Sequence, residues 1–139
     1  MNTPLKVLLN ELSRCQVCSL GLPLGARPVI RIQETARLLI ISQAPGTKAH
    51  DTGLPFNDAS GDRLREWLGL TREVFYDATK IAFMPMGFCY PGRNKKGGDL
   101  PPRQVCAPLW HSRILALLPQ VKLTLLVGRY AQDYYLKKG

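Results

Sequence analysis

Apolar residues recur at helical spacing in several parts of the chain. Four leucines from Leu5 to Leu12 follow an i, i+3, i+4, i+7 pattern, which predicts an amphipathic helix over residues 4–14. Further helices are predicted over residues 61–69, 102–118 and 129–138, with a short helical turn over 72–77. Asp58 or Ser60 can cap the second helix, because short polar side chains bind the free N–H groups of a first turn.

Three mainly apolar stretches alternate with these helices. They cover residues 37–42, 80–86 and 121–127 and are predicted to be strands. The first of them, RLLIIS, is a continuous apolar run, which is typical of a strand that is buried on both faces of a parallel sheet. The alternation of strands and helices therefore predicts an α/β fold with a mainly parallel sheet, in a single domain over residues 1–139. In the irregular segment 15–36, only a short strand at Val29–Ile32 is predicted.

The loop after the first strand, residues 43–59, is the first candidate for a binding site. Ligands of open α/β sheets bind beyond the carboxyl ends of the strands. Gly46 allows a close backbone approach, so that nearby N–H groups can face an anion, and Phe56 offers a flat apolar face. This combination suits a planar heterocycle. An ordinary turn with Phe56 in the core is the simpler interpretation of these residues alone.

The net charge of the chain indicates a class of binding partner. The 19 Lys and Arg residues exceed the 10 Asp and Glu residues and give a net charge of +9, which favours an anionic partner such as DNA. A basic surface that only aids solubility is the alternative. No apolar run reaches the roughly 20 residues of a membrane span, and the N-terminus is a poor signal peptide. A cytoplasmic monomer without membrane contact is expected.

Basic residues are concentrated in the loop that follows the second strand. The predicted phosphate-binding residues are Arg93, Lys95, Lys96 and Arg103. A charge run that is merely solvated is the alternative interpretation.

Four cysteines form two pairs, at the two ends of this loop and near the N-terminus. Cys15 and Cys18 form a C-x-x-C motif, and Cys89 and Cys106 flank the basic loop. In a cytosolic protein such pairs indicate metal or redox chemistry rather than disulfides. Four thiolates suit an iron–sulfur cluster or a tetrahedral zinc ion, and residue types alone do not separate the two. For Cys106 a buried free thiol is the alternative.

The segment IISQAPGTKAHDTGLPFNDASGDRL resembles the first motif of the uracil-DNA glycosylase superfamily, in its iron–sulfur branch, family 4. That branch has Gly-Glu-Ala-Pro-Gly after the first strand, then Gly-x-Pro-Phe, then a helix start that contains glycine. The matching parts here are Ser42–Gly46, Gly53–Phe56 and Ser60–Leu64. The branch also binds its cluster through a C-x-x-C pair and a second, widely spaced pair, as the four cysteines here are arranged.

This resemblance implies a fold, a substrate and a cofactor. The fold would be the three-layer uracil-DNA-glycosylase type, and the cofactor a [4Fe–4S] cluster on the four cysteines, with zinc as the alternative. The reaction would be hydrolysis of the N-glycosidic bond of a damaged, uracil-like base flipped from DNA during base excision repair. The base-binding residues would be Gln43, Ala44, Pro45, Gly46 and Phe56, with the loop facing a base oxygen and the ring stacking on the base.

Three departures from the family pattern bear on catalysis. Gln43 replaces Glu, and because an amide is no general base, Gln43 would position water while Asp51, or less plausibly His50, acts as the base. Pro85 replaces the Asn that reads uracil, and it has no side-chain donor. No His-Pro-Ser motif follows the third predicted strand, so the last strand is expected to be missing and the domain C-terminally incomplete.

These departures support an alternative function from a different class. The alternative is a non-catalytic nucleic-acid-binding protein that is stabilised by an iron–sulfur cluster or by zinc. Under either function, we expect weak or no activity on uracil from this chain.

Overall fold

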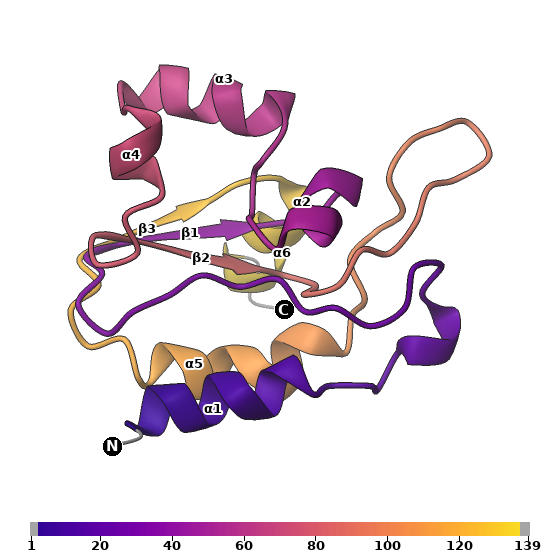
Figure 1. The fold of residues 1–139 in the computed structure, drawn as a ribbon, viewed down its shortest axis with the longest axis horizontal. Helices are drawn as coiled ribbons and strands as arrows, with labels where there is room; N and C mark the ends of the chain where they lie inside the picture. Colours follow the sequence, from indigo (N-terminus) through magenta and orange to yellow (C-terminus); the bar gives the residue numbers. More distant parts are fainter. Residues whose placement is uncertain (1–2, 137–139) are drawn as a thin grey trace.

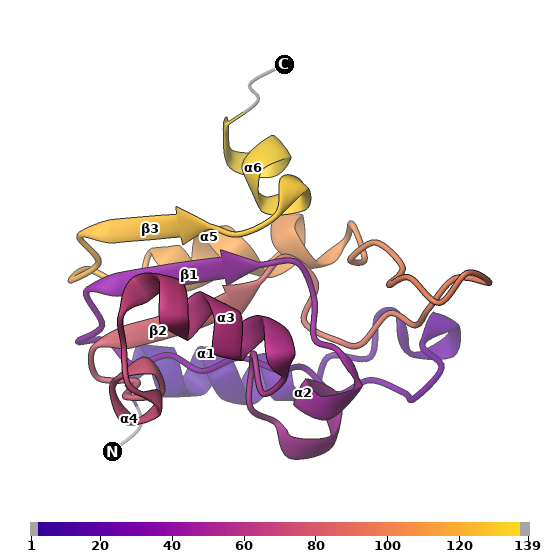
Figure 2. The ribbon, with the colours of Figure 1, turned by 90° about the horizontal axis from the view of Figure 1, so that it is seen from above.

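The computed structural model describes residues 3–136, and a parallel sheet lies at its centre (Figures 1 and 2). The strands are β1 (Leu38–Ser42), β2 (Ile81–Pro85) and β3 (Leu123–Leu126), in the order β2-β1-β3. In the middle strand, Leu38 pairs with Ile81 on one side and with Leu123 on the other. The predicted α/β fold with a parallel sheet is confirmed, and the carboxyl ends of all three strands meet at one edge.

Helices cover both faces of the sheet (Figure 1). The segment between β1 and β2 contributes α3 (Ala59–Leu68) and α4 (Arg72–Phe75) to one face. The opposite face is covered by α1 (Pro4–Ser13) and α5 (Ser112–Leu115). The chain crosses from β1 to β2 in one direction and from β2 past β1 to β3 in the other, so right-handed connections place the two sets of helices on opposite faces.

Alternating side chains of β1 enter two separate cores. Leu39 and Ile41 pack on the side of α1 and α5, whereas Ile40 packs with Phe75 and Phe83 on the other side. Successive strand residues point to opposite faces, so a strand covered on both faces needs apolar residues throughout. This explains the continuous apolar run that predicted the strand.

The edge strand β3 is less buried than β1 and β2. Leu123 has 58% of its surface exposed, and within residues 3–136 no strand pairs with the outer side of β3. Residues of β1 and β2 are therefore mostly buried, whereas β3 is only partly covered and contains the polar Thr124. After β3 the chain enters α6 (Arg129–Leu136), and the last part of the helix predicted over 129–138 lies outside the described residues.

Two predicted loop segments carry regular structure that differs from the expectation. A six-residue helix, α2 (Thr47–Thr52), lies inside the predicted loop and ends at Gly53, whose φ is 74°. It has no room for the apolar periodicity that reveals longer helices. In the N-terminal segment, Arg31 forms a single antiparallel bridge with Phe83 in place of the short strand predicted at Val29–Ile32.

The helix predicted over 102–118 is shorter and begins with a wide turn. It starts as the π-helical segment η2 (Ala107–His111) and continues as α5. Pro108 has no N–H group, so it is accommodated in a first turn, where that donor is not needed. Over residues 3–136, the helices are too short or too polar for any of them to cross a membrane.

Candidate active site

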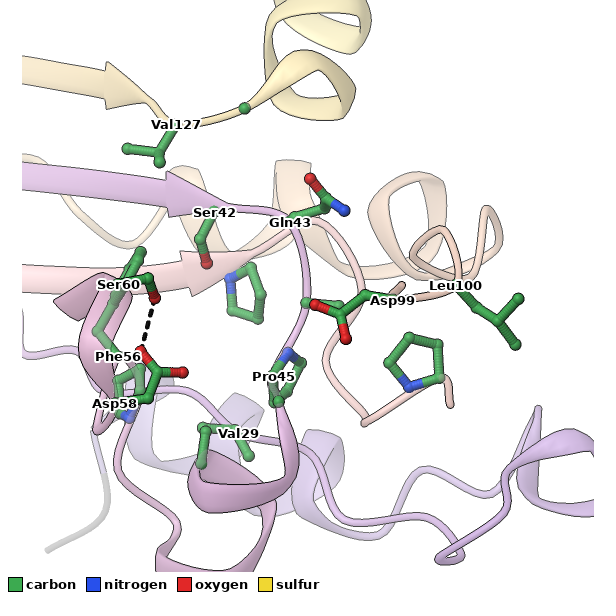
Figure 3. Close-up of a pocket in the computed structure, with 17 residues that line it drawn as sticks. Val29, Ser42, Gln43, Pro45, Phe56, Asp58, Ser60, Asp99, Leu100 and Val127 are labelled. Atoms are coloured by element: carbon green, nitrogen blue, oxygen red, sulfur yellow. Dashed lines mark hydrogen bonds between the residues drawn. The ribbon is translucent and has the colours of Figure 1, made fainter. Parts of the chain in front are cut away.

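A pocket of about 240 Å³ opens at the carboxyl ends of the three strands (Figure 3). Its walls come from the loop after β1, the turn before α3, and the segments that follow β2 and β3. All five predicted base-binding residues line it, namely Gln43, Ala44, Pro45, Gly46 and Phe56. The space is small and has both apolar and polar groups in its walls, which suits a single planar ring.

Hydrogen bonds hold the loop after β1 against the end of β2. The N–H of Met86 donates to the carbonyl of Ser42 at 2.7 Å, and the N–H of Gly87 donates to the carbonyl of Gln43 at 3.0 Å. Within residues 3–136, the N–H groups of Ala44 and Gly46 have no acceptor. The loop therefore uses its carbonyl groups for its own support and leaves N–H donors at the pocket.

The side chain of Gln43 reaches toward the end of β3. A Cβ atom on Gly128 would lie only 3.2 Å from Oε1 of Gln43, and Gly128 has a φ of 93°. The backbone conformation favours a glycine here, whereas the amide of Gln43, at the end of a flexible side chain, could move to admit a Cβ atom. This contact places Gln43 between the ends of the central and the edge strand.

Phe56 borders the pocket and contacts the core at the same time. Its ring centroid lies 5.7 Å from that of Phe83 and 6.2 Å from that of Phe75. Among the described residues, it is the only non-glycine residue with a positive φ, at 57°. A bulky residue in this conformation is strained. The packing that opposes this strain includes Gly61, which leaves room for the Phe56 carbonyl.

Two carboxylates line the pocket, on opposite sides (Figure 3). Asp58 caps α3, and its Oδ1 accepts from the N–H of Gly61 at 3.1 Å and from the hydroxyl of Ser60 at 2.6 Å. The other oxygen, Oδ2, accepts from no described residue and faces Gly46, where an added Cβ would lie 3.7 Å away. Asp99 stands on the far side and is exposed.

Asp51 and His50, the candidate bases predicted from the sequence, lie in α2 and do not line this pocket. Asp51 is exposed, and its backbone carbonyl accepts from the guanidinium of Arg27 at 3.1 Å. His50 is buried beside Tyr90, and its Nδ1 has no partner within the described part of the chain. The role predicted for Asp51 stays a prediction, and the fold brings Asp58 to the pocket instead.

A buried histidine anchors the end of β2 to α6. Nε2 of His111 lies 2.8 Å from the carbonyl oxygen of Pro85, and Nδ1 lies 2.5 Å from the hydroxyl of Tyr135. The carbonyl of Pro85 can only accept, so Nε2–H donates to it, and Nδ1 of the neutral ring accepts from the hydroxyl of Tyr135. Burial raises the pKa of this hydroxyl to about 12. Pro85, a pocket residue, is thus held through its only polar backbone group.

The protein should lose stability when the pH falls below about 6.5. Burial lowers the pKa of His111, so in mild acid the unfolded chain binds a proton that the folded chain excludes. The free energy of unfolding should fall by up to about 1.4 kcal/mol per pH unit, from the unfolded pKa down to the folded one. Urea unfolding between pH 5 and 7 measures this slope. In His111→Gln the slope should flatten, and an unchanged slope would assign the effect to other groups.

Three of the predicted phosphate-binding residues share one exposed turn. This turn is closed by an antiparallel bridge between Arg93 and Asp99, and Oδ1 of Asn94 accepts from the N–H of Lys96 at 2.9 Å. The three residues are Arg93, Lys95 and Lys96. Asp99 at the base of this turn lines the pocket, and the loop that carries the turn projects from the body of the molecule (Figure 1). Arg103 lies elsewhere, with its guanidinium bonded to the carbonyl of Gly21.

The four cysteines converge on a second, smaller cavity of about 20 Å³. All are free thiols, and the cavity is lined by Cys15, Cys18, Cys89 and Cys106. They come from the end of α1, the segment before η1 (Ser19–Gly21), the end of the β2 segment and the start of η2. Over residues 3–136, no three His, Cys, Asp or Glu side chains meet at the spacing of metal ligands.

The surroundings of these thiols are rich in unused N–H donors. Nε1 of Trp110 and Nε of Arg103 are buried without an acceptor in the described structure, and both residues line the cavity. Burial, together with repulsion from the other cysteines, raises the pKa of Cys89 to about 11. A hydrogen bond from the backbone N–H of Arg27 lowers this pKa but does not offset the effect of burial. Thiol ligands with N–H donors around them fit a metal–sulfur group, whose sulfur atoms accept such hydrogen bonds.

Fold and pocket together define an α/β protein with a cavity at the carboxyl edge of a parallel sheet, which is where proteins with open α/β sheets bind their ligands. The family model described as the uracil DNA glycosylase superfamily matches residues 30–138. The chain therefore belongs to the uracil-DNA glycosylase superfamily. The match spans all three strands and every residue that lines the pocket except Val29, whereas Cys15 and Cys18 precede it.

Proposed function

We propose that the protein is a DNA glycosylase that hydrolyses the N-glycosidic bond of a damaged, uracil-like base flipped from DNA. The observation that carries this proposal is the ring-sized pocket between Phe56 and the loop after β1, in a chain of this superfamily. A flipped base needs a site that receives it outside the duplex.

The chemistry of the pocket is suited to a departing base. Cleavage of the glycosidic bond leaves negative charge on the base and positive character on the sugar. The N–H groups of Ala44 and Gly46 have no internal acceptor, so they are available to that negative charge as in an oxyanion hole. Stacking on Phe56 would offset part of the few kcal/mol that unstacking the base costs.

Charge supports DNA as the substrate. The chain carries a net charge of +9, and the exposed tip with Lys95 and Lys96 projects from the rim of the pocket. Phosphate contacts there would hold the strand while its base enters the pocket, without reading sequence. Arg103 is already bonded to Gly21, so any contribution from it to DNA binding would require that contact to open.

For the cofactor we propose a [4Fe–4S] cluster held by Cys15, Cys18, Cys89 and Cys106, with zinc as the alternative. The convergence of four thiols on one cavity and the unused donors of Trp110 and Arg103 support a metal–sulfur group. Its contribution would be structural. It would tie the N-terminal helix to the segments on both sides of the basic loop.

One observation favours the alternative of a non-catalytic DNA-binding protein. Pro85 ends β2 at the pocket without a side-chain donor, and His111 occupies its carbonyl. The pocket thus lacks a polar side chain at this position to read the edge of uracil. A base with different edge chemistry, or an abasic site, would be bound under this alternative.

The test of the proposal is base release together with binding. Single-stranded and duplex oligonucleotides that carry uracil are the first substrates to test, and alkali converts any abasic sites to strand breaks. Because Gln43 and Pro85 depart from the family pattern, release of uracil should be weak. Phe56→Ala should weaken binding to a uracil-containing or abasic strand by about 1–3 kcal/mol, because base stacking is lost. Fluorescence anisotropy at fixed salt measures this difference.

Measurement of the unfolding free energy shows whether Phe56→Ala weakens binding through lost stacking on the base or through lost packing in the core. Phe56 contacts the core, so Phe56→Ala should also cost about 3–5 kcal/mol of unfolding free energy. Phe56→Leu keeps much of the apolar volume but removes the flat ring, and it serves as the matched control. If Phe56→Leu binds damaged and undamaged strands as the wild type does, Phe56 does not stack on a base. Absence of both base release and damage-selective binding would refute the proposed function.

A further inference from the structure

We propose that Asp58 is the catalytic carboxylate of this pocket, a role that rests on the proposed glycosylase function. The sequence places this residue at the start of a helix, where a cap explains it fully. The folded chain gives its second carboxylate oxygen another position, at the pocket and against the loop after β1.

The two oxygens of Asp58 have different surroundings. Oδ1 is occupied by the N–H of Gly61 and by the hydroxyl of Ser60, which fix the orientation of the carboxylate. Oδ2 faces Gly46 and receives no hydrogen bond from residues 3–136. A carboxylate that is fixed through one oxygen and open through the other can accept a proton from a bound water.

The turn that carries Asp58 is itself fixed on both sides. The hydroxyl of Tyr76 donates to the carbonyl of Pro55 at 2.6 Å, and the guanidinium of Arg72 donates to Oδ1 of Asn57 at 3.0 Å. Asp58 therefore follows a rigid segment that also sets the ring of Phe56. Preorganisation of this kind is what a reacting group needs, because a misplaced group loses much of its effect.

The other candidates have weaker claims to this role. Gln43 borders the pocket, but its amide cannot accept a proton at neutral pH. Asp51 is exposed in α2 and lies outside the pocket lining. Asp99 lines the pocket but has a largely exposed side chain, 4.0 Å from the guanidinium of Arg93. Asp58 alone of the three carboxylates is half-buried, oriented by hydrogen bonds and next to the stacking residue.

The proposed step is hydrolysis by water. The bond from C1′ of the sugar to the base nitrogen breaks, and its electron pair leaves with the base. The oxygen of the water forms the new bond to C1′, and the carboxylate of Asp58 takes the proton that this water loses. That proton then passes to the departing base or to solvent, which restores Asp58. Before the water attacks, the same negative charge stabilises the positive character of the sugar.

The first experiment compares two Asp→Asn substitutions in the same helix. Asn caps a helix about as well as Asp, so Asp58→Asn should fold normally. Its single-turnover rate of base release should fall by about 100-fold or more, while its affinity for a uracil strand stays within a few-fold. Asp62→Asn, in the exposed first turn of α3, is the control and should keep the wild-type rate. Full activity in Asp58→Asn, or loss only in Asp51→Asn, would overturn the assignment.

A second measurement keeps the assignment testable if the wild type releases no base. DNA that contains a cationic pyrrolidine abasic analogue should bind more tightly than DNA with the neutral tetrahydrofuran analogue. In Asp58→Asn this preference should shrink about tenfold, because the negative charge next to the sugar is gone. An equal preference in the two proteins would overturn the role of Asp58. Lack of base release with a preference that depends on Asp58 would instead refute glycosylase activity alone.

Discussion

Gly61→Ala should lower the free energy of unfolding by about 3–5 kcal/mol, a large part of the stability of an ordinary domain. A Cβ atom at this position would lie 1.8 Å from the carbonyl oxygen of Phe56 and 2.7 Å from its carbonyl carbon. Both are backbone atoms, so no side-chain rotation can relieve the clash. Urea unfolding followed by circular dichroism gives the difference.

Gly69→Ala is the matched control for this experiment. Gly69 ends the same helix with a φ of 68°, but nothing lies within 4 Å of the position of its missing Cβ. That substitution should cost only the left-handed strain, about 1–2 kcal/mol. If Gly61→Ala were as stable as Gly69→Ala, the turn that carries Phe56 and Asp58 would have another conformation in solution.

Cys89→Ser should lose the metal centre and much of the stability that depends on it. Protein purified without oxygen should be brown and contain iron and sulfide in equal amounts, and the variant should be colourless. Because metal-binding energy is also folding energy, its unfolding free energy should fall by several kcal/mol. Iron and sulfide analysis with a melting curve measures both effects.

A second residue of the same cavity tests whether the loss comes from ligation. Val105 lines the cavity and has no metal-binding group, so Val105→Ala should keep its iron. If the wild-type protein is colourless and contains one zinc ion per chain, the metal at this site is zinc and not an iron–sulfur cluster, and the predicted ligands are unchanged. Full iron content in Cys89→Ser would exclude this cysteine as a ligand.

The sequence predicted the parallel sheet because the strands at its centre are visible as apolar runs in the sequence. The runs at residues 37–42 and 80–86 are apolar except at their ends, and both faces of β1 and β2 are covered in the structure. The family motif also placed the loop after β1 and Phe56 together, and both border the pocket. Such features depend on a local pattern or on a motif of residues that are close in the sequence. Both can be recognised in one sequence without a structure.

What the sequence did not predict depends on contacts between distant segments. Asp58 is a capping residue by local pattern, and only the approach of Gly46 makes it a pocket carboxylate. Asp51 was predicted from its place in the same loop, but α2 turns it outward. The anchoring of Pro85 by His111 and Tyr135 joins three elements, and no spacing along the chain indicates it.

The composition of the pocket wall also sets when the site can form during folding. The cavity is lined by residues that lie far apart in the sequence, among them Ser42, Phe56, Pro85 and Gly128. Parallel strands must first be joined through complete crossover connections, and such non-local pairing is slow compared with helix formation. A nascent or partly folded chain can therefore hold its helices without holding a pocket. Under the proposed function, binding of a damaged strand would begin only after all three strands have paired, and it would therefore report the completion of the sheet during refolding.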